Sequence, residues 1–123
     1  MSIRTERVGK LLQRELADIL ITEFGEQLQP MMTVTGTRVT KDLSLAYVNV
    51  SVYGSSPDQR QAAFKHLDSL TPQIRAALAR RIRHQMRKVP ELRFFLDETL
   101  EQAKKMERLF DQIRDEREQR EDS

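Results

Sequence analysis

A strict alternation over residues 44–53 is the feature that most constrains the fold of this chain. Its apolar positions are Ala46, Val48, Val50 and Val52, and they alternate with Leu45, Tyr47, Asn49 and Ser51. Successive side chains of a strand point to opposite faces of a sheet, so this segment predicts a strand that is covered on one side. Residues 31–39 are rich in β-branched side chains and predict a second strand, in which Gly36 indicates a bulge. The short link Thr40-Lys41-Asp42 predicts a hairpin.

Helical patterns flank these strands on both sides. Apolar residues recur at three- and four-residue steps in four segments, which are residues 4–24, 57–70, 72–88 and the segment from Thr99 onward. Gly25 is expected to end the first helix in a left-handed conformation. The alternation of Leu92, Phe94 and Leu96 predicts a third strand. The order α-β-β-α-α-β plus a terminal helix predicts an α+β domain, with a three-stranded sheet and helices on one face.

A proline separates the two middle helices. Ser56-Pro57 begins the first of them with a capping residue followed by Pro, and Thr71-Pro72 repeats that signal fifteen residues later. Pro inside a continuous helix removes a hydrogen bond and clashes with the preceding turn. We therefore expect two helices joined at Leu70-Thr71-Pro72 by almost no loop, with Thr71 as the cap of the second.

The second of these helices carries a run of one sign of charge. No acidic residue lies between Asp68 and Glu91, although opposite charges one turn apart usually support an exposed helix. The run is either an incidental solvated face or a phosphate-binding surface, and its arginines suit bidentate phosphate contacts. The RNA-binding residues predicted on the second interpretation are Arg75, Arg80, Arg81, Arg83, Arg87, Lys88 and, at the helix junction, Thr71. Possible additional contacts come from the outer face of the first helix, at Arg4, Arg7 and Lys10.

Signals for an enzyme are poor. Cys is absent, which excludes disulfides, thiolate metal sites and cysteine nucleophiles. His66 and His84 are the only histidines, and no catalytic, metal-ligating or phosphate-loop motif is visible. We expect no catalytic residue, no metal and no cofactor. Tyr47, Tyr53, Phe94 and Phe95 could stack on bases, but most of them are expected in the core.

Charge divides the chain into two parts. The net charge of +2 arises from +6 over residues 1–96 and −4 over residues 97–123, and a basic body favours a polyanionic partner. The 123 residues suit one domain, predicted over residues 4–113. Residues 114–123 are predicted to be an acidic, disordered tail, since no apolar residue follows Ile113. No apolar run is long enough for a membrane span or a signal peptide.

Several stretches resemble the ribosome-binding factor A family. They are residues 4–8 (RTERV), residues 16–20 (LADIL), residues 33–43 (TVTGTRVTKDL) running into residues 46–50 (AYVNV), Ile74-Arg75 and, most specifically, residues 87–100 (RKVPELRFFLDETL). The resemblance covers residues 4–113 and implies a type II KH-like fold. Members of the family commonly have Ala-x-Gly at the helix junction. Leu70, Thr71 and Pro72 stand at the matching positions here, and Pro72 still enforces a break.

The resemblance implies a non-catalytic factor of bacterial ribosome assembly. Such factors bind the immature 30S subunit through its 16S rRNA, assist late maturation and rRNA processing, and support growth in the cold. The chain is accordingly expected to be cytoplasmic and monomeric, with no membrane partner. The alternative is a protein-interaction module that docks a partner through an amphipathic helix, with an incidental basic face. RNA binding would weaken steeply with salt, whereas apolar docking would not.

Overall fold

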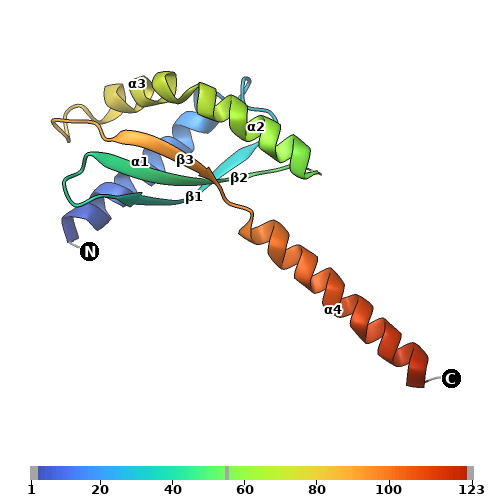
Figure 1. Ribbon diagram of the computed structural model, residues 1–123. Coiled ribbons are helices and arrows are strands. Elements are labelled where there is room, and N and C mark those ends of the chain that lie inside the picture. The colour runs from blue at the N-terminus through green and yellow to red at the C-terminus, as the bar shows by residue number, and fades with distance from the viewer. Residues whose placement is uncertain (1–2, 55, 122–123) are drawn as a thin grey trace.

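The computed structural model describes residues 3–54 and 56–121. Its elements in chain order are α1 (Ile3–Thr22), β1 (Met32–Val39), β2 (Leu45–Val52), α2 (Pro57–Ser69), α3 (Thr71–Ile82), β3 (Glu91–Leu96) and α4 (Thr99–Glu121). This is the predicted α+β order of a KH-like domain followed by a terminal helix. Figure 1 shows α1, α2 and α3 on one side of the sheet, and α4 projecting away from it.

The three strands form one sheet in the order β1-β2-β3. β1 and β2 are antiparallel, and their register shifts between Val34 and Gly36, which confirms the predicted hairpin and bulge. β3 is parallel to β2 and begins beside Leu45. A parallel neighbour requires the chain to cross back over the sheet. The helices α2 and α3 make this crossing, and so their apolar sides cover the sheet.

The core lies between the helices and one face of the sheet. Its fully buried side chains include Leu12, Leu16, Ile19, Val48, Val50, Leu67, Ile74, Leu78 and Ile82. They come from the apolar faces that the periodicity predicts. The residues of β2 and β3 that alternate with these buried positions face away from the helices, and they are exposed or half-buried. The second face of the sheet is therefore uncovered.

Two helix ends differ from the sequence prediction. α1 ends at Thr22, and Gly25 is not left-handed as expected. Gly is required there by a close approach, because a Cβ would collide with the carbonyl oxygen of Ile21. α3 ends at Ile82 rather than at residue 88. The chain needs residues 83–90 to return to the start of β2, where the amide of Glu91 donates to the carbonyl oxygen of Ser44 at 2.9 Å.

The terminal helix extends further than expected. α4 continues to Glu121, through most of the segment predicted to be disordered, and residues 122–123 lie outside the described residues. Opposite charges four residues apart, at Arg114 and Glu118 and again at Glu116 and Arg120, support a helix even without apolar residues. All side chains described from residue 102 to 120 are exposed. No helix within the described ranges is both long and apolar enough to cross a bilayer.

Candidate nucleic-acid interface

The junction between α2 and α3 is a sharp break at a single residue. Leu70 lies outside both helices, with φ −93° and ψ 4°. Its amide donates to the carbonyl oxygen of Leu67, and its own carbonyl accepts from the amide of Ile74, both at 2.9 Å. Pro72 occupies the first turn of α3, where a missing N–H costs nothing. The predicted pair of helices with almost no loop is confirmed.

The hydroxyl of Thr71 does not cap α3, so that part of the prediction is wrong. Its Oγ1 donates to the carbonyl oxygen of Asp68 at 2.7 Å, and Ser69 Oγ donates to the carbonyl oxygen of His66 at 2.6 Å. Both hydroxyls therefore donate to carbonyls in the last turn of α2, where the intrahelical hydrogen bonds run out. α3 begins without a side-chain cap.

Arg75 holds the chain segment that precedes β3. Its Nε donates to the carbonyl oxygen of Pro90 at 3.0 Å, and its Nη2 donates to that of Val89 at 2.7 Å. The planar guanidinium thus joins α3 to the start of the third strand. Two of the five N–H donors of the guanidinium are thereby fixed on backbone carbonyls, and three remain for another partner.

Arg81 is the centre of an ion-pair cluster between α3 and the C-terminal part of α1. Its guanidinium donates to Asp18, to Glu23 at 3.1 Å and to Glu15 at 3.4 Å, and its side chain is only 27% exposed. The hydrogen bond to Asp18, followed by those to Glu15 and Glu23, raises the pKa of Arg81 above its usual value. The Arg81 cluster (Glu15, Asp18, Glu23 and Arg81) neutralises this part of the predicted basic face.

The other predicted arginines of α3 are more open. Arg80 lies 3.6 Å from a carboxylate oxygen of Glu23, but its side chain is 67% exposed. Arg83 follows the last residue of α3, and its Nε lies 3.4 Å from Nε2 of His84. Arg87 and Lys88 lie in the exposed loop before β3 rather than on a helix. Across residues 3–54 and 56–121, no ion pair involves Arg83, Arg87 or Lys88.

One end of the sheet gathers the open cations. The loop of residues 83–90 leads to Glu91, which bonds Ser44 beside the β1–β2 hairpin. α1 passes the same end, because Gly9 lies against Thr37 and Val39 of β1. Figure 1 shows the start of α1, the hairpin and the α3–β3 loop together at this end. We call the exposed cations of these segments the basic end; they are Arg4, Arg7, Lys10, Lys41, Arg83, Arg87 and Lys88.

The surface of the described residues carries several hollows with polar or mixed linings. The described part of the chain contains no group of three or more His, Asp or Glu side chains placed to hold a metal ion. His66 lines a hollow of about 420 Å³ between Pro30 and α2, together with Tyr53. A polar hollow of about 400 Å³ lies where α4 leaves the sheet, beside Asn49 and Asp97. Hydrogen bonds from Thr99 and Thr35 lower the pKa of Asp97, which therefore stays ionised and acts as a structural acceptor.

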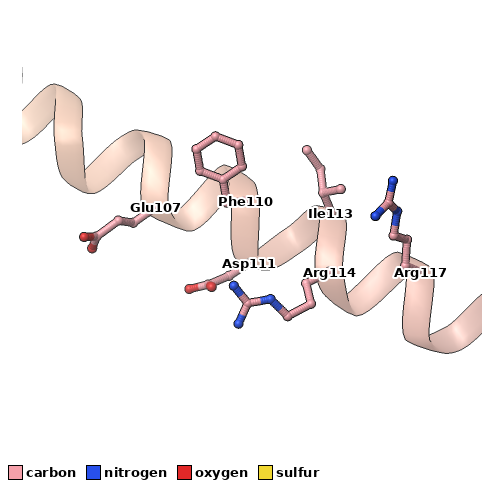
Figure 2. A pocket seen from close by; sticks show the side chains of 6 residues that line it. All are labelled: Glu107, Phe110, Asp111, Ile113, Arg114 and Arg117. Carbon is pink, nitrogen blue, oxygen red and sulfur yellow. The ribbon is translucent and has the colours of Figure 1, made fainter.

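The terminal helix presents a bare apolar stripe. Its members, 45–58% exposed, are Met106, Leu109, Phe110 and Ile113. A hollow of about 590 Å³ is lined by Glu107, Phe110, Asp111, Ile113, Arg114 and Arg117. Figure 2 shows Phe110 and Ile113 pointing to one side of α4, and Asp111 and Arg114 to another. A hollow lined by one helix has no opposing wall to enclose a small molecule. The stripe itself suits a protein partner that packs against the apolar side of α4.

Aromatic side chains divide between the core and the open face of the sheet. Phe94 is buried as expected, at 6% exposure, whereas Phe95 is 47% exposed. Tyr47 pairs with Phe95 on the open face, with ring centroids 5.8 Å apart. The expectation that most aromatic residues are buried is therefore wrong for Phe95 and Tyr53. The signal was available in the sequence, since adjacent residues of a strand cannot both face the core.

Comparisons with known proteins point to one family. The family described as ribosome-binding factor A matches residues 4–110. The chain is 47% identical to ribosome-binding factor A of Chlorobium luteolum, over 93% of this chain and 94% of that protein. It is 45% identical to the Chlorobaculum tepidum protein of the same name, over 93% of each chain.

Solved structures give the same result. The crystal structure of ribosome-binding factor A from Thermus thermophilus is similar with a TM-score of 0.59 and 28% identity, over 75% of this chain and 94% of that one. A homology model of the Thermus thermophilus protein, fitted into a cryo-EM map of a 30S complex, is similar with a TM-score of 0.56. Its identity is 30%, over 72% of this chain and 90% of that one.

Proposed function

Because this chain belongs to the ribosome-binding factor A family, we propose that it is a non-catalytic assembly factor that binds the immature 30S subunit through its 16S rRNA. The observation that carries the proposal is the match over residues 4–110, joined to a similar Thermus thermophilus protein fitted into a map of a 30S complex. In this proposal the factor acts as a cytoplasmic monomer late in maturation and rRNA processing, and supports growth in the cold.

The basic end supplies the phosphate contacts in this proposal. Arg83, Arg87 and Lys88 have no carboxylate partner within the described ranges, so binding an RNA phosphate breaks no ion pair of the fold. Arg4, Arg7 and Lys10 extend the same charge along α1. Arg and Lys contacts to phosphates release counterions and make binding strongly dependent on salt. Arg75 and Arg81 contribute indirectly, since they fix α3 on the domain.

Sedimentation with ribosomal subunits tests this proposal. The protein is centrifuged with immature and with mature 30S subunits at about 50 and about 200 mM salt. We expect co-sedimentation with immature subunits, weaker at the higher salt, and little with mature ones. R87E/K88E should bind less well by about a factor of ten or more. K104E/K105E, which changes the net charge equally but on α4, is the matched control and should bind like the unmodified protein. Failure of the unmodified protein to bind immature subunits would refute the proposal.

The apolar stripe on α4 supports a second candidate function, in which the chain docks a protein partner through that helix. Four apolar side chains at helical spacing remain exposed, and no other element of the described chain covers them. Subunit binding that is insensitive to salt, abolished by F110E and unchanged by R87E/K88E would favour this candidate over RNA binding.

A further inference from the structure

The open face of the sheet carries a row of charged and aromatic side chains in register. Arg38 on β1 pairs with Tyr47 on β2, and Tyr47 pairs with Arg93 on β3. Phe95 lies one step further along β3, opposite Asn49, and its ring contacts that of Tyr47. Paired residues of neighbouring strands share a face, so the four side chains of Arg38, Tyr47, Arg93 and Phe95 project on the side away from the helices. We call them the platform.

The platform is accessible and its charges are not used by the fold. Phe95 is 47% exposed, and both Arg38 and Arg93 are exposed. Within residues 3–54 and 56–121, neither arginine makes an ion pair, in contrast to Arg81. The helices α1, α2 and α3 lie on the opposite face, and α4 leaves the sheet after Leu96 without covering it (Figure 1).

We propose that this platform binds unpaired bases of single-stranded RNA by stacking on Phe95 and Tyr47, while Arg38 and Arg93 hold the flanking phosphates. The proposal rests on the proposed function for the source of the RNA, the immature subunit, but its chemistry follows from the platform alone. Neighbouring strands are ~4.8 Å apart, so the Cα atoms of Arg38 and Arg93 lie about 10 Å apart, with Tyr47 between them. Aromatic rings between cations suit a flexible strand with exposed bases, whereas a duplex keeps its bases stacked.

The surroundings of the platform favour RNA over a protein partner. Thr33, Ser51 and Asn49 share the face with the aromatic pair and offer hydroxyl and amide groups. Leu45 and Glu91 share it at the start of β2 and β3, so a single apolar and a single acidic side chain lie beside the platform at that end. A protein-docking face normally has an apolar centre, such as the stripe on α4. Arg93 is the third residue of β3, and the loop that carries Arg87 and Lys88 leads directly into that strand, so the platform begins next to the basic end. One RNA strand can pass from the phosphate contacts of the loop to the stacking surface of the sheet.

Tyrosine fluorescence provides a direct test. The chain has two tyrosines and no tryptophan, so Y53F leaves Tyr47 as the single reporter. The full-length Y53F protein is titrated with an unstructured RNA of about 12 nucleotides, and separately with the same RNA annealed to its complement. We expect the single strand to quench Tyr47 saturably and the duplex, at equal phosphate concentration, to leave it unquenched. Equal quenching by both, or binding without quenching, would overturn the proposal.

A matched pair of variants locates the stacking. F95A is expected to weaken single-strand binding about 5- to 150-fold, as loss of one base–aromatic stack does. F110A removes the same ring from an exposed site on α4 and should leave the affinity unchanged. If F95A is not folded by circular dichroism, R38Q/R93Q takes its place and should lower both the affinity and its salt dependence. If F95A, or R38Q/R93Q in its place, leaves the affinity for single-stranded RNA unchanged, the proposal that the platform binds RNA is wrong.

Subunit sedimentation separates this failure from failure of the proposed function. If F95A binds immature subunits as the unmodified protein does, and short RNA with unchanged affinity, the platform is wrong while the proposed function stands. If the unmodified protein binds no subunits yet short RNA quenches Tyr47, the proposed function is wrong while the platform stands.

Discussion

Arg81 gives the sharpest distinction between a structural and a functional arginine. Its guanidinium contacts carboxylates of Glu15, Asp18 and Glu23, which lie on or just after α1. Exposed ion pairs contribute roughly 0.2–1 kcal/mol each to stability. The Arg81 side chain is 27% exposed, so solvent screens its ion pairs only in part. R81A would also leave three carboxylates facing one another. We therefore expect R81A to lower the free energy of unfolding by about 1–2 kcal/mol.

Thermal unfolding followed by circular dichroism measures this effect. For a domain of this size the loss corresponds to a fall in Tm of about 3–10 °C. The fall should shrink in about 1 M NaCl, where exposed charges are screened. R83A removes the same charge from a site without a carboxylate partner and should leave Tm almost unchanged. A normal Tm for R81A together with a large loss of RNA affinity would refute the structural role and would show that Arg81 binds RNA.

Three further predictions concern other parts of the fold. Hydrogen bonds from Ser44 and Thr40 lower the pKa of Asp42 from 3.8 to about 2. The stability advantage over D42N should therefore be complete well above the unfolded-state pKa of 3.8, decrease as the pH falls through that value and be mostly lost near pH 2, in an acid titration of unfolding. L78A removes a fully buried side chain and should cost about 2–5 kcal/mol in denaturant unfolding. P72A should remain folded but bind immature subunits less well, if the break at the helix junction sets the direction of α3; normal binding would make the break purely structural.

The elements of the fold could be predicted because local patterns determine them. Alternation over β2 and the two Pro signals at α2 and α3 are short-range features, and the structure confirms them. The end of α3 could not be predicted in the same way. Residues 83–88 contain good helix formers and no stop signal before Pro90. The helix ends earlier because β3 must begin beside β2, which is a tertiary requirement.

The candidate site was only partly predictable for a similar reason. The sequence shows a run of cations, but the partners of Arg81 lie 58–66 residues away in the chain. No spacing rule reveals a partner at such a distance. Arg75 is likewise fixed by backbone carbonyls of a loop whose position depends on β3. The run therefore contains two arginines that hold the fold, and others, among them Arg83 and Arg87, whose charge remains available.

The separation of these roles has a consequence for how the domain binds. The helices α1, α2 and α3 all pack on one face of the sheet and form the core there. The open face, the basic end and α4 therefore lie outside that core. Phosphate contacts at the basic end release counterions, whereas stacking on Phe95 does not. Loss of Arg87 and Lys88 should therefore flatten the salt dependence of RNA binding, while loss of the Phe95 ring should shift the affinity equally at every salt concentration. Parallel salt titrations of R87E/K88E and F95A should show two different slopes, and identical slopes would mean that the two surfaces do not bind RNA in distinct ways.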